Sequence, residues 1–117
     1  MTKLDDPTRL RHMMEYAQKL LEFSSGKTQS AIASDEILSL AIVRLAEIIG
    51  EAAANVSEEK QQQYPQIQWR KVIGMRNRIV HAYFDIDMEV VWQTITQDIP
   101  ALVSQLNEVF KAEGIDL

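Results

Sequence analysis

Hydrophobic residues recur with a helical period along the chain, and the first segment shows this most clearly. Its apolar positions follow the i, i+3, i+4, i+7 spacing of one helix face: Leu10, Met13, Met14, Ala17, Leu20 and Leu21. The pattern begins near Asp6 and Pro7 and stops at Ser24–Gly26. We expect Asp6 to cap this helix and Pro7 to lie in its first turn, where a missing N–H costs nothing. Gly26–Gln29 is the evident flexible connection to the next segment.

A second, longer helix is predicted from about Ser34 to Asn55. Its apolar positions are numerous enough to form a wide hydrophobic face: Ile37, Leu38, Ala41, Ile42, Leu45, Ile48, Ile49, Ala52 and Val56. A helix this apolar is expected to lie centrally, with neighbours on more than one side. Gly50 and the alanines that follow it would let another backbone approach closely.

Two further helices follow in the middle of the chain. Ser57 opens a short polar helix by capping it, and Tyr64-Pro65 ends it. A third main helix is then predicted from roughly Gln66 to Ala82. No strand alternation is evident here or elsewhere in the sequence.

The last helix begins after Asp85 and Asp87 and continues to Phe110. Pro100 falls within its pattern, so a kink or a restart is expected there. The sequence therefore predicts an all-α bundle of four main helices plus one short helix, as one domain over residues 1–117.

Size and composition limit the classes of protein to consider. With 117 residues the chain can form one hydrophobic core but not two. It has no cysteine, which excludes disulfides and thiolate metal sites and fits a reducing compartment. No apolar run approaches the ~18 residues needed to span a bilayer, and the first residues lack the apolar centre of a signal peptide. A cytoplasmic location is therefore expected.

Charge is distributed unevenly along the chain. The net charge of −5 argues against broad, nonspecific binding of nucleic acid, which needs a basic face. Residues 66–84 nevertheless carry Arg70, Lys71, Arg76 and Arg78 with no acid. A small positive site in a repulsive envelope suits a narrow RNA target or an active cleft. Arg70, Lys71 and Arg78 are thus candidates for RNA contact, although solvation of one helix face would explain them equally well.

The segment from Met75 to Tyr83 holds the most informative chemistry. Arg76, four residues, His81, one residue and Tyr83 form a short but moderately specific spacing. An arginine can hold a phosphate with a planar fork of donors, and a histidine can move protons near neutral pH. Together they indicate cleavage of a phosphodiester without a metal. No cluster of His, Cys or carboxylate residues has ligand spacing, so no metal or other cofactor is expected.

Arg76 has an unusual place in the helical pattern. The apolar stripe of the third predicted helix leaves position 76 where a core residue should stand: Trp69, Val72, Ile73, Ile79, Val80 and Tyr83. Arg76 is therefore expected to point into the bundle or into a subunit interface. A guanidinium there needs a function or a partner, for example Glu47 or Glu51.

His81 does not share the direction of Arg76. Five residues of helix turn the side-chain direction by roughly 140°, whereas Asn77 and His81, at i and i+4, are neighbours on one face. Arg76 and His81 could converge if the arginine wraps around the helix, if the helix end unwinds near Ala82, or if a second subunit contributes.

Three stretches of the sequence match a known family pattern. They are Ile48–Ala53, Pro65–Trp69 and Gly74–Asp87, and Val91-Trp92 and Asp98–Pro100 follow the last of them. Gly74–Asp87 contains arginine, a polar residue, three to five others, histidine, any residue and tyrosine. On these residues the chain resembles the HEPN superfamily, and within it the HepT-like ribonuclease toxins. The resemblance covers nearly the whole chain. It implies a helical bundle that forms a homodimer, with the motif helices of two subunits facing one cleft.

The resemblance also implies an activity and a partner. The activity is metal-independent cleavage of RNA by a toxin of a type VII-like toxin–antitoxin system. The partner is a nucleotidyltransferase antitoxin (the MntA type), which would silence the toxin by transferring AMP to Tyr83. In this hypothesis His81 transfers protons and Arg76 positions the phosphate and stabilises its charge. Asn77 would orient His81 or the phosphate, and Tyr83 would hold the substrate and be the site of AMPylation.

Two other interpretations stay open. The domain could be a catalytically silent helical partner of a nucleotidyltransferase that binds a nucleotide or a substrate phosphate. It could also be a plain dimerising bundle with an internal ion pair at Arg76. Growth arrest on expression, abolished by Arg76→Ala, would distinguish the nuclease from both.

Overall fold

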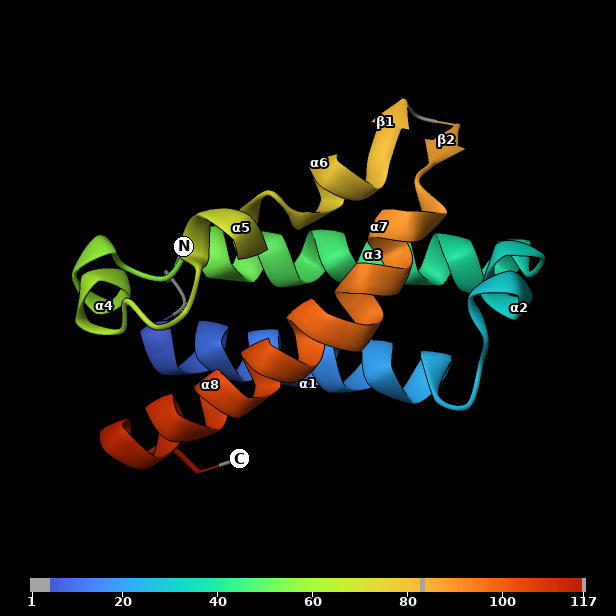
Figure 1. Ribbon diagram of the computed structural model, residues 1–117. Helices are drawn as coiled ribbons and strands as arrows, with labels where there is room; N and C mark the ends of the chain where they lie inside the picture. The colour runs from blue at the N-terminus through green and yellow to red at the C-terminus, as the bar shows by residue number, and fades with distance from the viewer. Residues whose placement is uncertain (1–4, 83, 117) are drawn as a thin grey trace.

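The computed structural model describes residues 5–82 and 84–116, and two long helices dominate the first half of the chain (Figure 1). α1 (Asp6–Ser24) and α3 (Glu36–Ala54) lie side by side and run in opposite directions. Both helices were predicted from the hydrophobic pattern, and their bounds agree with the predicted ones to within about two residues. The two helices share the most extensive packing in the molecule, which confirms the central position expected for α3.

Side chains at the helix starts set these boundaries. The Thr28 hydroxyl accepts a hydrogen bond from the backbone N–H three residues on, at 3.0 Å, and so begins α2 (Gln29–Ala33). This short helix follows directly where a flexible connection was predicted. The cap of α1 is Asp5, whose carboxylate accepts a backbone N–H at 2.9 Å, so the predicted cap at Asp6 is wrong.

Asp6 has a different role, because it ties two distant parts of the chain together. Its carboxylate accepts hydrogen bonds from the Ser57 backbone N–H at 2.9 Å and from the Ser57 hydroxyl at 2.7 Å. Ser57 is also the cap of α4 (Glu58–Gln63), as the sequence predicted. The start of α4 is thereby fixed to the start of α1.

The third predicted helix is interrupted and ends early. α5 (Trp69–Ile73) and α6 (Met75–Ile79) meet at Gly74, and the backbone then becomes extended in β1 (Val80–Ala82). β1 pairs antiparallel with β2 (Asp85–Ile86), the first residue of β1 lying opposite the last of β2. Glycine weakens a helix, and β-branched residues favour an extended backbone. The predictions of one continuous helix and of no strand are therefore wrong at this place.

The last predicted helix is divided at its proline. α7 (Met88–Gln93) passes through a π-helical turn, η1 (Thr94–Asp98), into α8 (Ile99–Glu113). Pro100 lies in the first turn of α8, where it lacks the N–H that a continuous α-helix would use. The predicted kink or restart is confirmed. Gly114, with a φ of 65°, then ends α8 in the left-handed conformation.

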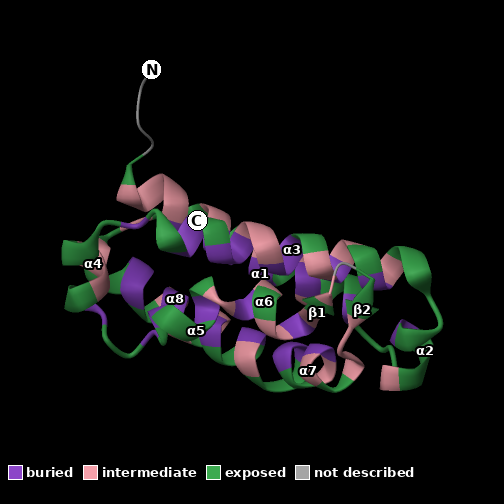
Figure 2. Cartoon of the chain, turned by 90° about the horizontal axis from the view of Figure 1, so that it is seen from above, coloured by how far each residue is buried: buried purple, intermediate pink, exposed green. Residues whose placement is uncertain are grey.

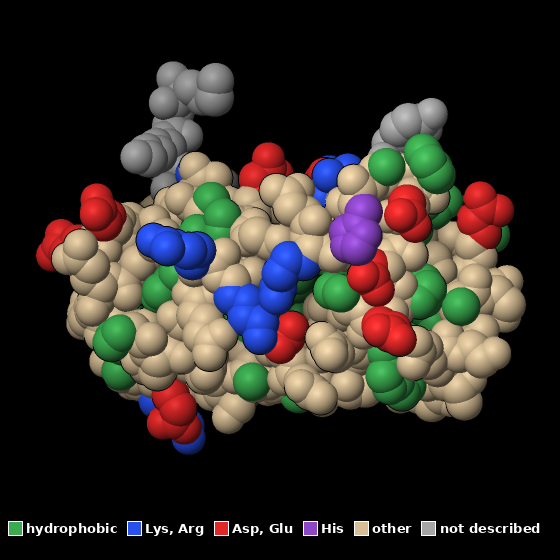
Figure 3. Space-filling view, turned by 45° about the horizontal axis from the view of Figure 1, so that its top comes forward, with side chains coloured by type: hydrophobic (Ala, Val, Ile, Leu, Met, Phe, Trp, Pro, Cys, Tyr) green, Lys and Arg blue, Asp and Glu red, His purple; other side chains and the backbone are tan. Residues whose placement is uncertain are grey.

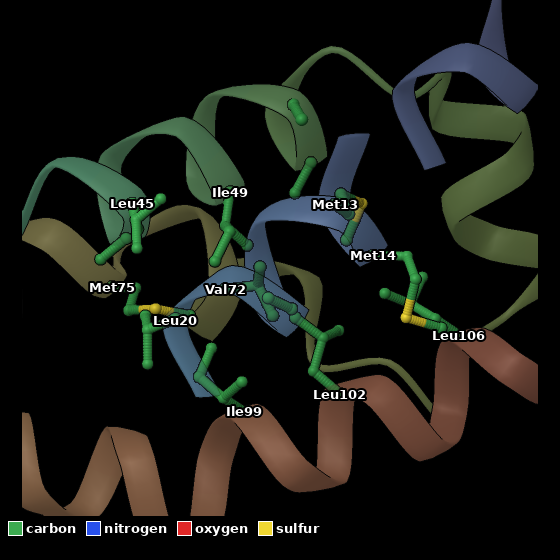
Figure 4. Packing of buried hydrophobic residues seen from close by; sticks show 14 of the residues in the cluster. Met13, Met14, Leu20, Leu45, Ile49, Val72, Met75, Ile99, Leu102 and Leu106 are labelled. Carbon is green, nitrogen blue, oxygen red and sulfur yellow. The ribbon is translucent and has the colours of Figure 1, made fainter. Parts of the chain in front are cut away.

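The buried hydrophobic side chains form one cluster between these elements. Figure 2 shows buried residues along the sides of the helices that face one another, with exposed residues on the outer sides. The side chains that meet in the centre are labelled in Figure 4: Met13, Met14, Leu20, Leu45, Ile49, Val72, Met75, Ile99, Leu102 and Leu106. The predicted all-α bundle is confirmed, with its third main helix divided. Among residues 5–82 and 84–116, none of the helices has the length and apolarity needed to cross a membrane.

Gly50 brings the backbones of α3 and α5 into direct contact. A Cβ at this position would lie 2.9 Å from the carbonyl oxygen of Ile73 and 3.1 Å from that of Val72, closer than side chains tolerate. The close approach predicted at Gly50 is therefore confirmed. It also places α5 and α6, which lead into the motif segment, directly on α3 (Figure 1).

Candidate functional site

The motif segment lies where α6 gives way to the hairpin of β1 and β2. Arg76 and Asn77 are on α6, His81 is on β1, and Tyr83 lies outside the described residues. Because α6 ends at Ile79, a strand and not a helix sets the direction of the His81 side chain. Unwinding was one of the three ways in which the arginine and the histidine could converge. It occurs, but earlier than predicted.

Arg76 does not occupy a core position. Met75 fills that position with 1% exposure, whereas the Arg76 side chain is 40% exposed. The buried residues Val72, Met75 and Ile79 are themselves spaced i, i+3 and i+7, so the inward-facing stripe runs through Met75 and leaves Arg76 at its edge. Ile73, three residues before Arg76, lies on the same edge and is 39% exposed, although it was expected in the apolar stripe. The predicted burial of Arg76 inside the bundle is therefore wrong, and its place in a subunit interface stays a prediction.

The guanidinium of Arg76 is loosely held. Its Nε lies 4.0 Å from Glu47 Oε2, and its Nη1 donates to Asn77 Oδ1 at 3.5 Å. Glu47 also pairs with Arg44 of its own helix. The predicted ion pair with Glu47 is present, but an exposed pair of this kind contributes at most about 1 kcal/mol. Within the described part of the chain the Arg76 Nε is shielded from solvent and has no hydrogen-bond partner. The group is thus available to another anion.

A shallow surface hollow surrounds Arg76. It is lined by α3 together with α5 and α6: Glu47, Gly50, Glu51, Ala54, Ile73, Arg76 and Asn77. The charged groups of this hollow are two carboxylates and one guanidinium, so a single subunit presents a net negative charge here. An RNA phosphate would need further positive charge at this place, from a neighbouring surface or a second subunit.

His81 pairs with a carboxylate that the sequence did not assign to the site. Its Nε2 lies 3.4 Å from Asp87 Oδ2. The other oxygen of Asp87 caps α7 by accepting the backbone N–H groups of Glu89 and Val90. Asp87 was predicted only as a residue after which the last helix begins. The signal that could have identified it is an acidic cap six residues beyond His81, on the far side of a tight turn.

Among the described residues, no hydrogen bond joins the two main motif side chains. Arg76 pairs with Glu47 of α3, whereas His81 pairs with Asp87 at the start of α7. Asn77 contacts Arg76 and makes no described hydrogen bond to His81, since the helix that would align them ends first. In residues 5–82 and 84–116, no three His, Cys, Asp or Glu side chains gather closely enough to hold a metal ion. The chemistry offered is a cation and a proton carrier on one face.

The three candidate RNA contacts lie beside one another on α5 and α6. Arg70, Lys71 and Arg78 line a second surface hollow together with Gln68, Trp69 and Gly74. Arg78 donates from Nη2 to the Lys71 carbonyl at 3.2 Å, and Lys71 Nζ pairs with Asp98 at 3.0 Å. Figure 3 shows Lys and Arg side chains gathered on this face, next to a histidine flanked by acidic side chains. Arg70 is exposed, and of the three it is the one most available to a phosphate.

The strongest electrostatic coupling lies elsewhere, between α4 and α8. The Tyr64 hydroxyl donates to Glu113 Oε2 at 2.6 Å, and this hydrogen bond is the main reason that the pKa of Tyr64 is raised to about 12. The pKa of Glu113 is lowered, chiefly by its hydrogen bond from Lys60. This cluster lies far from the motif residues in the fold, and it stabilises the end of the bundle where α4 meets α8.

Comparison with known proteins was informative over most of the chain. Residues 13–109 match the family model described as "Ribonuclease HepT-like". The protein "Putative RNase TTE0752" of Caldanaerobacter subterraneus subsp. tengcongensis is 33% identical over 104 residues, which cover 89% of this chain and 93% of that protein.

Two archaeal proteins are similar to the same extent. "Probable ribonuclease HepT" of Thermococcus cleftensis is 32% identical over 102 residues, covering 87% of this chain and 93% of that protein. "Putative RNase MJ1380" of Methanocaldococcus jannaschii is 28% identical over 109 residues, covering 93% of this chain and all of that protein. No solved structure gives a significant match.

Proposed function

The chain belongs to the HepT-like ribonuclease family, and from that premise we propose that it cuts RNA without a metal ion, using Arg76 and His81. One observation carries the assignment to these residues. The motif puts an exposed, loosely held guanidinium on α6 and a carboxylate-paired imidazole on β1, the strand that directly follows it. These are the two groups that a metal-free phosphodiester cleavage requires.

The proposed reaction uses the nucleophile that RNA carries. The 2′-oxygen attacks the neighbouring phosphorus while His81 takes the 2′-OH proton, and Arg76 binds the phosphate oxygens and stabilises the charge of the phosphorane. The bond from phosphorus to the 5′-oxygen then breaks, and the departing oxygen takes a proton from water. The products are a 2′,3′-cyclic phosphate and a 5′-OH end. Asn77 accepts only a long hydrogen bond of 3.5 Å from Arg76 Nη1, so its amide can turn to orient the phosphate for this step.

A homodimer would supply what one subunit lacks, because in the described residues Arg76 and His81 are paired with different carboxylates and make no hydrogen bond to each other. Large apolar side chains are exposed at the hollows that lie between α3 and the motif segment: Leu40, Ile73 and Phe84. Ile73 lines the hollow of Arg76, and Leu40 and Phe84 line another hollow beside the hairpin. Both hollows border α3, so these side chains lie along one side of the molecule. We propose that a second copy covers this side and brings its own His81 toward Arg76 of the first.

The regulatory part of the proposal concerns Tyr83. The residue lies outside the described part of the chain, but its sequence neighbours belong to the hairpin, and Phe84 is 76% exposed. A modifying enzyme could reach a turn of this kind. We propose that a nucleotidyltransferase antitoxin attaches AMP to Tyr83, which would place an anion near Arg76 and His81 and repel RNA. The toxin would act in the cytoplasm, because a chain without cysteine forms no disulfides and so needs no oxidising compartment.

The test is cleavage of a labelled RNA in excess chelator. The wild-type chain should cut and leave cyclic phosphate ends, while Arg76→Ala and His81→Ala should lose activity. The matched control is His12→Ala, which removes the only other histidine, on α1. A wild-type chain that binds RNA or a nucleotide but never cuts would contradict the proposal. That result would support the alternative of a catalytically silent partner of a nucleotidyltransferase. Full activity of His81→Ala would end the assignment of that residue.

The proposal for Tyr83 has its own experiment. Co-expression of the antitoxin should add the mass of one AMP group to the wild-type chain and none to Tyr83→Phe. Tyr83→Phe should then arrest growth even in the presence of the antitoxin, whereas Tyr16→Phe should be silenced like the wild type. Complete silencing of Tyr83→Phe would contradict the proposal.

A further inference from the structure

Asp87 is the nearest described acidic neighbour of His81. The histidine lies on β1 and is half exposed, and its Nε2 lies 3.4 Å from Asp87 Oδ2. Asp87 directly follows β2, so the hairpin folds a residue six positions along the chain back onto the histidine. The contact therefore depends on the turn that replaces the end of the predicted helix.

The Asp87 carboxylate cannot turn freely. The backbone N–H of Asp87 donates to the carbonyl of Ile79, at the end of α6, at 2.7 Å. Its Oδ1 accepts the backbone N–H groups of Glu89 at 3.1 Å and Val90 at 3.2 Å, which caps α7. A cap of this type is worth about 1 kcal/mol. Because one oxygen is committed to the helix, the second oxygen is held in a fixed direction, toward the imidazole.

Other charged groups on the neighbouring elements do not replace this contact. They are Asp85 on β2, Glu89 on α7, and Arg76 and Arg78 on α6. Among the carboxylates of the described residues, only that of Asp87 lies within 4.0 Å of the imidazole. The two arginines are directed toward α3 and toward the carbonyl of Lys71 instead.

We infer that Asp87 is the positioning residue of His81: it holds the imidazole through Nε2 and leaves Nδ1 to exchange the proton with RNA. The chemical part of this inference rests on the proposed function, whereas the pairing rests on the geometry alone. The carboxylate itself takes no proton in the reaction. It restricts the rotation of an otherwise exposed ring; carboxylates that orient metal-bound histidines contribute about 10- to 100-fold, and we expect an effect of that order here.

The kinetic test is Asp87→Asn. Asparagine caps a helix as well as aspartate does, so α7 should be kept while the carboxylate is lost. We expect kcat to fall about 10- to 100-fold with KM within about twofold, and the melting temperature to stay within about 2 °C of the wild type. Asp87→Ser, which also caps, should lose as much. The matched control is Asp85→Asn, which removes the same charge from β2 and should keep full activity. Equal activity of Asp87→Asn and Asp85→Asn would overturn the inference.

A second test does not depend on RNA cleavage. Iodoacetamide alkylates either nitrogen of an exposed imidazole, and the two products are separable. In the wild type His81 should give mainly the Nδ1 product, because Asp87 covers Nε2. In Asp87→Asn the share of the Nε2 product should rise at least threefold, with His12 unchanged as an internal reference.

An unchanged isomer ratio at His81 would overturn the pairing. A chain that cuts no RNA but still shows an isomer ratio dependent on Asp87 would instead overturn the nuclease assignment and leave the pairing supported. The failures of the two proposals are thus distinguishable.

Discussion

The polar contacts at the α4–α8 end differ in strength and in exposure from those at the motif face, the surface around Arg76 and His81. At the α4–α8 end, Glu113 accepts from the Tyr64 hydroxyl at 2.6 Å and pairs with Lys60, and the side chains of Lys60 and Glu113 are only 22% and 19% exposed. At the motif face, Arg76 and Glu47 are 40% and 43% exposed and 4.0 Å apart. One set of groups is satisfied and shielded, and the other is open and weakly paired.

This difference shows how one small fold separates stability from function. A structural contact gains from short distance and from exclusion of water, since both strengthen its electrostatics. A group that must bind RNA has to exchange its contacts, and a loose ion pair costs little to break. His81 is intermediate, because it is exposed while its partner Asp87 is fixed by a helix cap. A weakly paired Arg76 and a restrained His81 fit the roles of phosphate clamp and proton carrier that we propose for them.

The largest expected effect comes from removing one charged side chain at each end and comparing the two variants. Arg76→Ala should lower RNA cleavage about 10²- to 10³-fold, as for other groups that stabilise developing charge. Its melting temperature should change by no more than about 2 °C, because an exposed pair is lost. Glu113→Ala should keep activity within about twofold but melt several degrees lower, because it leaves Lys60 and Tyr64 without their shared partner.

Cleavage assays and thermal unfolding on the same preparations measure both quantities. The comparison fails if Arg76→Ala is the less stable of the two variants, or if Glu113→Ala is the less active.

A smaller effect is expected from Gly50→Ala, which changes the support under the motif face. The new methyl group would meet the carbonyl oxygens of Ile73 and Val72 at 2.9 and 3.1 Å, so backbone atoms must move. The expected loss of stability is about 1–3 kcal/mol, against which alanine's better helix propensity returns at most about 1 kcal/mol. Cleavage should fall as well, because α5 and α6 are displaced.

Urea unfolding and the cleavage assay test this expectation. Glu51→Ala, one residue on along α3, serves as the control and should be close to neutral in stability. A Gly50→Ala chain more stable than the wild type would show that the contact is not limiting.

The smallest effect concerns the phenol at the α4–α8 end. Tyr64→Phe removes the hydrogen bond to Glu113 and should cost about 1 kcal/mol at neutral pH without changing cleavage. The pKa of Tyr64 is raised to about 12 from its ordinary value of 10.0, mainly by that hydrogen bond. The stabilisation is therefore complete below pH 10 and is lost as the pH rises toward 12.

Unfolding measured between neutral and alkaline pH should show this loss in the wild type and in the control Tyr16→Phe, but a smaller one in Tyr64→Phe. For Glu113 the dependence of stability on pH has the opposite sign, because the pKa of its carboxyl group is lowered. Its contribution is present above its ordinary value of 4.5 and is lost as the pH falls through the lowered value. Parallel alkaline curves for all three chains would contradict the role of the phenol.

Much of the fold was predictable from hydrophobic period and capping residues. The bounds of α1 and α3, the serine cap of α4, the close approach at Gly50 and the restart at Pro100 all follow from local rules. These features depend on residues a few positions apart. The period alone could not show that Met75 and not Arg76 faces inward, because these residues stand three and four positions after Val72 and both fit the helical spacing.

The residue types of the proposed site come from the sequence, but the geometry of these residues could not be predicted from it. The spacing from Arg76 to His81 indicated the candidate groups, yet it was interpreted on a continuous helix. The hairpin after Ile79 decides where His81 points, and its pairing depends on a β-branched helix end and on contacts with α7. Asp87 was missed because a helix cap and a histidine partner look the same in sequence.

The measurement that tests the central claim most directly is complementation between Arg76→Ala and His81→Ala. Each variant alone should be inactive. If the site combines Arg76 of one copy with His81 of another, a mixed dimer keeps one intact site of two, and an equal mixture with random subunit exchange should recover roughly a quarter of wild-type cleavage. Native mass spectrometry establishes that the mixed dimer forms. A mixed dimer that forms but cuts no RNA would contradict the account.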